Sequence, residues 1–150
     1  MRTCLTMLAA TLLFAGELPA QSADDLLQIE IAAAQRAVSG GNIARNLITV
    51  EGRYAAARVA PGTPAGGARP AERTEGIRNA VTAPSTYRRP YGETLLLLSE
   101  PQVSGDAAEV TTTLYRMTPT GRREFDTFVM TLRRTGSGWV VQSAERLGSS

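Results

Sequence analysis

The chain lacks histidine and lysine altogether and contains one cysteine, Cys4, among its 150 residues. Without histidine there is no imidazole base, no Ser-His or Cys-His nucleophile and no histidine ligand for zinc or iron. Without lysine, Schiff-base chemistry and the phosphate-binding lysine of a P-loop are excluded. Carboxylate, tyrosine, hydroxyl and arginine chemistry remain. We therefore expect no cofactor and no metal site.

A strong excess of charge of either sign is also missing. The 16 basic residues, all arginine, exceed the 14 acidic ones by two, and they form no run of five. A dominant phosphate-binding face is therefore not expected, and we predict no nucleic-acid partner. With 43% hydrophobic and 20% charged residues, the composition is that of one globular domain.

The N-terminus has the three-part pattern of a secretory signal peptide. Arg2 is followed by an apolar run at 5–15 and then by Gly16-Glu17-Leu18-Pro19-Ala20. A membrane-spanning helix needs about 20 apolar residues, so the run is too short to be one; a buried N-terminal helix is the alternative. We predict a signal peptide at 1–20, cleaved after Ala20 or Ala23, and a periplasmic or secreted protein that meets a membrane only through this transient segment.

The mature chain begins with an amphipathic helix, predicted at about 24–39. Ser22 suits the N-cap, and Asp24 and Asp25 suit the first turn, where the helix dipole favours acids. Gly40-Gly41 is expected to end the helix as a left-handed C-cap. The apolar stripe at helical spacing consists of Leu27, Ile31, Ala34 and Val38.

The middle of the chain carries weaker signals. A short apolar run at 47–50 predicts a strand. From 55 to 71, 13 of 17 residues are Ala, Gly or Pro, which predicts a flexible surface loop. Pro70 then introduces a second helix at about 71–83. Its few apolar anchors are Ile77 and Val81.

Four strands with tight links are predicted in the C-terminal 60 residues, at 94–98, 107–117, 122–134 and 139–147. If the turns make Met117 oppose Arg122 and Arg134 oppose Trp139, one face of the sheet is apolar and can receive the first helix. That face carries Phe128, Met130, Leu132, Trp139 and Val141. The other face is expected to carry Leu114, Arg116, Arg123, Phe125, Val129, Thr131, Arg133, Gln142 and Arg146. The predicted fold is α+β: one domain at 24–148, with the helices on one side of a curved four-stranded antiparallel meander.

Two segments resemble the nuclear transport factor 2-like (cone-fold) superfamily, which includes ketosteroid isomerases. The stretch at 103–110 is similar to the turn-into-strand phrase of that family, and the stretch at 131–141 to its final hairpin. The resemblance implies a cone that encloses a pocket, and a homodimer formed through the sheet.

The same register places Tyr115, Glu124 and Asp126, together with Thr113, on the helix-facing side near one end of the apolar patch. A carboxylate beside apolar walls has a raised pKa, and a tyrosine opposite it could donate a hydrogen bond to an oxyanion. These residues are therefore candidates for an isomerase or dehydratase site. The alternative is a solvated strand end, where the acids pair with Arg122 or Arg123.

A second candidate site consists of Tyr87, Arg88, Arg89 and Tyr91, where arginines between aromatic residues could bind an anion or stack on a ring. The alternative is a polar loop that covers the sheet edge. From the sequence we expect an exported domain that binds a small ligand or a protein without catalysis, with the Tyr115–carboxylate enzyme as the alternative.

Overall fold

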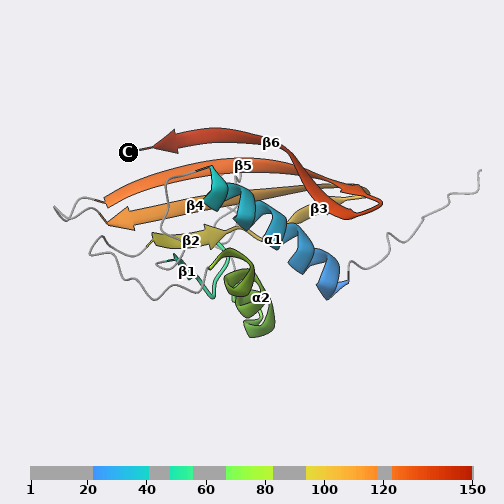
Figure 1. Cartoon of the computed structure of the whole chain (residues 1–150), viewed down its shortest axis with the longest axis horizontal. Coiled ribbons are helices and arrows are strands. Elements are labelled where there is room, and N and C mark those ends of the chain that lie inside the picture. The colour runs from blue at the N-terminus through green and yellow to red at the C-terminus, as the bar shows by residue number, and fades with distance from the viewer. Residues whose placement is uncertain (1–21, 41–47, 56–66, 83–93, 118–122, 150) are drawn as a thin grey trace, which may run out of the picture.

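Two helices lie on one side of a six-stranded sheet (Figure 1). The structure is a computed structural model that describes residues 22–40, 48–55, 67–82, 94–117 and 123–149. The predicted signal peptide and most of the predicted loop at 55–71 lie outside the described residues. So does the candidate site made of Tyr87, Arg88, Arg89 and Tyr91.

Helix α1 (Ala23–Ser39) confirms the first predicted helix. The Ser22 hydroxyl accepts a hydrogen bond from the backbone N–H of Asp25 at 3.1 Å, as an N-cap should. The predicted left-handed C-cap is wrong at Gly40, which has φ −77° and ψ −11°. There the Gly40 N–H and the Ser39 hydroxyl both donate to the Arg36 carbonyl, at 3.2 and 3.1 Å.

Strand β1 (Ile48–Val50) and helix α2 (Ala71–Val81) confirm the elements predicted for the middle of the chain, and β2 (Thr94–Leu98) confirms the first of the four C-terminal strands. Their pairing differs from the prediction, because β1 runs parallel to β2. Parallel neighbours need a crossover connection, and α2 lies between the two strands in the chain. The sheet is therefore mixed rather than a purely antiparallel meander.

The rest of the sheet is antiparallel, in the order β1-β2-β4-β5-β6, with β3 on β4. Strand β3 was not predicted, because it has only three residues and follows a proline. Gly105, with φ +59°, makes the two-residue turn that joins β3 to β4. The strands are β3 (Gln102–Ser104), β4 (Ala107–Met117), β5 (Arg123–Thr135) and β6 (Gly138–Ser149).

The predicted register between β4 and β5 is wrong by one residue. Met117 opposes Arg123 rather than Arg122, and Tyr115 opposes Phe125 rather than Glu124. A slip of one residue moves every side chain of a strand to the other face of the sheet. The side chains that lie on the face opposite to the predicted one are Thr113, Leu114, Tyr115 and Arg116.

The register between β5 and β6 agrees with the prediction only near the hairpin. Arg134 opposes Trp139, as expected, but Met130 opposes Ala144 instead of Ser143. Irregularities of the β-bulge type shift the pairing between Thr131 and Leu132 and again between Thr127 and Phe128. As a result Arg146 opposes Phe128 and lies on the helix side, not on the other face.

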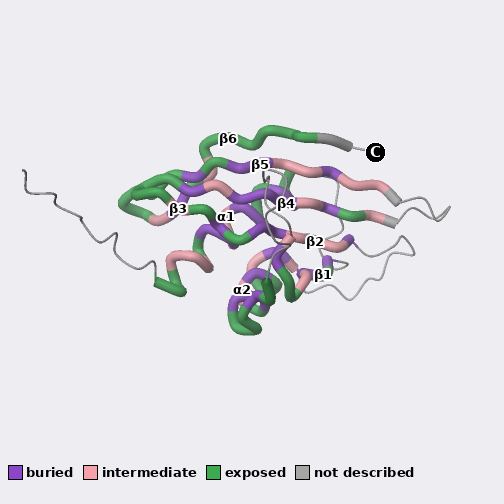
Figure 2. The backbone as a smooth tube through the Cα atoms, turned by 180° about the vertical axis from the view of Figure 1, so that it is seen from behind, coloured by how far each residue is buried: buried purple, intermediate pink, exposed green. Residues whose placement is uncertain are grey.

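The core lies between α1 and the helix-side face of the sheet, as predicted. Met130, Leu132 and Trp139 are buried, and Phe128 and Val141 pack against them. Helix α1 crosses the sheet obliquely, and β4, β5 and β6 extend beyond its C-terminal end (Figure 1). Strand β6 is exposed along most of its length (Figure 2). The apolar residues of α1 and α2 that complete the core are Ile29, Ala33, Ala34, Ala37, Val38, Ile77 and Val81.

Candidate functional site

Three side chains from neighbouring strands meet on the helix-side face beyond α1. The Asp126 carboxylate on β5 accepts a hydrogen bond from Arg116 Nη2 on β4 through Oδ2, and from Arg146 Nη2 on β6 through Oδ1. The side chain of Asp126 is 12% exposed, whereas those of Arg116 and Arg146 are 33% and 55% exposed. We call this group the arginine–aspartate cluster. It carries two positive charges and one negative.

The predicted catalytic residues do not form one site. Asp126 and Glu124 lie on the helix side, because Asp126 opposes the buried Leu114 and Glu124 is two residues away on the same strand. Tyr115 lies on the opposite face of the sheet, is 40% exposed, and its ring centroid is 6.0 Å from that of Phe125. A hydroxyl on one face cannot act with a carboxylate on the other. The partners of Asp126 are also Arg116 and Arg146 rather than the predicted Arg122 or Arg123.

A second charged group, which the sequence did not reveal, lies between the two helices. The carboxylate of Glu30 on α1 is completely buried and accepts hydrogen bonds from Arg69 Nε at 3.1 Å and Arg73 Nε at 2.9 Å. The Arg69 guanidinium also donates to the carbonyls of Glu51 at 2.6 Å and Leu98 at 3.1 Å. This buried charge cluster therefore ties α1 and the start of α2 to the ends of β1 and β2.

The ring of Tyr54 completes the buried charge cluster. The guanidinium carbons of Arg69 and Arg73 lie 4.6 and 5.5 Å from its centroid, close enough for cation–π attraction. Burial, followed by the negative charge of Glu30, raises the pKa of the Tyr54 hydroxyl above its usual value of 10.0. All four side chains are engaged with each other, so we assign them a structural role.

Two features of the sequence could have revealed the buried charge cluster. Glu30 is three residues after Leu27 and four before Ala34, so it lies on the apolar stripe of α1. Arg73 stands in the first turn of α2, where the helix dipole disfavours a cation. Arg69 gave no such signal, because it lies within the predicted surface loop and is nevertheless 4% exposed.

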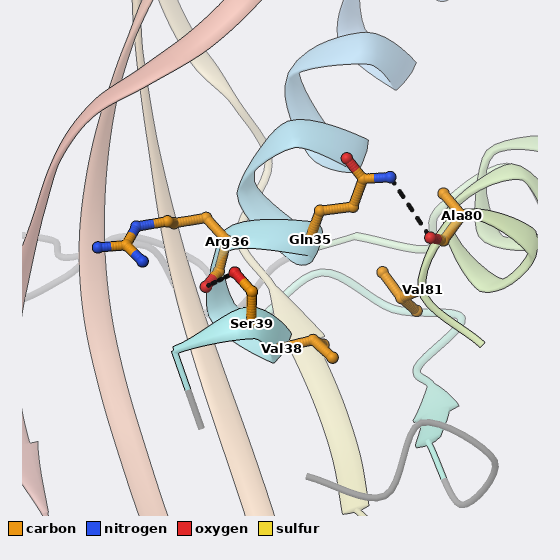
Figure 3. A pocket seen from close by; sticks show the side chains of 6 residues that line it. All are labelled: Gln35, Arg36, Val38, Ser39, Ala80 and Val81. Atoms are coloured by element: carbon orange, nitrogen blue, oxygen red, sulfur yellow. Dashed lines mark hydrogen bonds between the residues drawn. The ribbon is translucent and has the colours of Figure 1, made fainter. Parts of the chain in front are cut away.

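A shallow pocket of about 290 Å³ lies between the C-terminal ends of α1 and α2 (Figure 3). Gln35 reaches across it and donates from Nε2 to the Ala80 carbonyl at 3.4 Å, and Arg36 points away from α2. The lining has no carboxylate and no nucleophile other than one serine hydroxyl. It consists of Gln35, Arg36, Val38, Ser39, Ala80 and Val81.

The sheet face opposite the helices, which we call the far face, is not covered by either helix. A row of apolar side chains crosses three strands there, because Leu95 opposes Tyr115 and Tyr115 opposes Phe125. Exposed Val140 lies on the same face beside Arg133. The far face includes Leu95, Leu97, Glu109, Thr111, Thr113, Tyr115, Phe125, Thr127, Val129, Thr131, Arg133, Val140, Ser143 and Glu145.

The described residues offer neither a cluster of metal ligands nor a membrane-spanning helix. They contain no group of three or more Cys, Asp or Glu side chains placed to hold a metal ion. Neither helix in this part of the chain is long and apolar enough to cross a membrane.

Comparisons with known proteins do not identify a family for this chain. No protein-family model matches the chain, and no curated protein matches it significantly. One solved structure, described as a calcium/calmodulin dependent protein kinase II association domain from Xanthomonas campestris, resembles it at 8% sequence identity and a TM-score of 0.29. The match covers 82% of this chain and 80% of that one. A likeness this weak supports no conclusion about fold or function.

Proposed function

We propose that this chain is a small exported domain that binds a protein partner through the far face and performs no chemistry of its own. The observation that carries the proposal is the apolar row made of Leu95, Tyr115 and Phe125, which neither helix covers and in which Tyr115 is exposed. Apolar side chains that neighbour one another on an uncovered face are typical of interaction sites. The two rings, with centroids 6.0 Å apart, offer the rigid aromatic contacts that anchor interfaces.

The partner that we propose is a second copy of the chain. A two-fold interface uses the same surface on both subunits, so that surface must be complementary to itself. The far face meets this condition, because Arg133 and Glu109 supply charges of opposite sign on the same face, at the end of β4 and β5 away from the apolar row. Two copies related by a two-fold axis can therefore pair arginine with glutamate while the aromatic rings meet.

Export is the other half of the proposal and rests on the N-terminal sequence alone. The secreted or periplasmic protein should begin at Gln21 or Asp24, after cleavage at Ala20 or Ala23. N-terminal sequencing of the protein recovered from the exporting cell tests this. Recovery of the uncleaved chain in the cytoplasm would contradict it.

Size-exclusion chromatography with light scattering tests whether the partner is a second copy of the chain. The mature wild-type chain should elute as a dimer, and Tyr115→Arg should elute as a monomer, because it places two cations in the apolar centre of the interface. Asn79→Arg adds the same charge to an exposed position of α2 and should leave the dimer intact. A wild-type monomer at high concentration, or equal effects of the two variants, would overturn the proposal.

A further inference from the structure

The arginine–aspartate cluster lies on the opposite side of the sheet from the far face, and the proposed dimer does not use it. Asp126 holds each guanidinium through one Nη2 atom. An arginine carries five N–H donors, so among the described residues most of the donors on both side chains remain for another acceptor. Arg116 Nε, for example, has no hydrogen-bond partner in the described part of the chain.

Both guanidiniums are held in place before any ligand arrives. Arg116 and Arg146 stand on strands that flank β5, and the nearly buried Asp126 carboxylate fixes each of them from β5. A side chain that is already immobilised loses little conformational entropy when it binds a ligand. Their exposed fractions of 33% and 55% leave both groups accessible to solvent.

The surface beside Arg146 is open and partly apolar. Phe128, its direct cross-strand partner, is half-buried. Ala144 lies on the same face opposite the buried Met130, yet it is exposed. Strands β5 and β6 extend beyond the C-terminal end of α1 (Figure 1), and Phe128 and Ala144, which we call the shelf, lie on this face next to Arg146.

The charges of the cluster favour a ligand with one negative charge. The two arginines exceed Asp126 by one positive charge, and the nearby Glu124, the cross-strand partner of Arg116, opposes any further anion. A carboxylate has one charge and two oxygens, which suits paired guanidinium donors. A phosphate dianion would leave a net negative charge at the site.

We propose that Arg116 and Arg146 bind the carboxylate of a small monocarboxylate whose apolar body lies over Phe128 and Ala144. This site is independent of the proposed dimer surface, so either proposal can fail without the other. Calorimetric titration of the mature protein with sodium butyrate, at constant ionic strength maintained with sodium chloride, tests the proposal. Acetate and inorganic phosphate are titrated in parallel.

Butyrate should bind with one site per chain, more tightly than acetate, and inorganic phosphate should bind more weakly than either. Arg146→Gln should lower the affinity for butyrate at least about tenfold, because it removes a charge-assisted hydrogen bond. Arg78→Gln, which removes from α2 an arginine that is also exposed and paired with one carboxylate, should leave the affinity unchanged. Circular dichroism checks that both variants are folded.

Three results would overturn the proposal: no butyrate binding by the wild type, equal losses in the two variants, or tighter binding of phosphate than of butyrate. Because Arg146 is more than half exposed, Arg146→Gln is not expected to unfold the chain. If it does unfold, Ala144→Glu provides the second test. That change places a negative charge on the shelf and should abolish butyrate binding while both arginines remain.

Discussion

Strands β4 to β6 and the segment that holds β1 and α2 are attached to α1 by different forces. The three strands bury a continuous apolar face against the helix, with Leu132 and Met130 at its centre. The β1–α2 segment supplies few large apolar side chains, and the buried charge cluster joins it to Glu30 instead. Apolar burial is non-directional, whereas a buried ion pair is stable only with all its partners in place. The comparison therefore predicts that single substitutions act differently in the two regions.

The largest effect is expected at Glu30. Glu30→Gln removes the carboxylate that pairs with Arg69 and Arg73, so both buried cations lose this counter-charge. Breaking a buried pair in this way typically costs about 3–5 kcal/mol. Urea denaturation should show a loss of this size in the free energy of unfolding.

The matched control for Glu30 is Glu75, which pairs with Arg78 on the exposed side of α2. Exposed pairs contribute less than about 1 kcal/mol, so Glu75→Gln should change stability little. If the two variants lost equal stability, the buried charge cluster would not be what holds α2.

Substitution of Leu132 tests how much the apolar contact between α1 and the sheet contributes to stability. The Leu132 side chain is fully buried beneath α1, and Leu132→Ala should lower the free energy of unfolding by about 2–5 kcal/mol through lost burial and a cavity. Thr131→Ala, one residue earlier and exposed, should cost far less. A small effect of Leu132→Ala in thermal denaturation would mean that the helix does not cover this face.

A smaller loss of stability is expected from Asp25, in the first turn of α1. Asp25 accepts hydrogen bonds from Arg134 and from Trp139 Nε1, the latter at 3.2 Å, and so joins the first turn of the helix to the β5–β6 hairpin. Asp25→Ala should cost about 1 kcal/mol more than Asp24→Ala. Both variants lose a carboxylate that favours the helix dipole, so the difference measured by denaturation isolates the contact. Equal losses would show that the contact adds nothing.

The smallest effect concerns Tyr54 and appears only at high pH. Its pKa is raised in the folded state, so above pH 10 the unfolded chain releases this proton more readily than the folded one. Stability should therefore fall as the pH rises above 10, and Tyr54→Phe should remove part of that fall. Tyr115→Phe, at an exposed position, is the control. An unchanged pH profile in Tyr54→Phe would contradict the assigned environment.

The two regions also differ in how well their sequence predicts them. Helix α1, with Ser22 at its N-cap, and strands β4 to β6 follow from apolar spacing and from turns rich in glycine. The register between β4 and β5 does not follow from these patterns. Met117 pairs with Arg123, one residue later than predicted, and this shift moves the side chains of β4 to the opposite face of the sheet. No pattern in the sequence marks the shift. The shift at Thr131 is similar, since a bulge depends on how neighbouring strands twist.

These two errors also explain why the predicted site failed. The predicted β4–β5 register put Tyr115 on the same face as Asp126, whereas it lies on the other face. The predicted β5–β6 register put Arg146 on the far face, so its contact with Asp126 was missed. The buried charge cluster joins residues 39 and 43 positions apart in the chain. Local patterns carry no information on such distant contacts, although Glu30 on an apolar stripe was a usable signal.

Native-state hydrogen exchange tests most directly whether charges attach the β1–α2 segment to α1 while apolar burial attaches strands β4 to β6. The measurement compares the wild type with Arg73→Lys. Lysine keeps the positive charge but loses the paired guanidinium geometry toward Glu30. The account predicts that exchange accelerates in α2 (Ala71–Val81) by local opening, while the amides of β4 and β5 keep their protection. Equal acceleration in α2 and in the sheet, or none in α2, would contradict it.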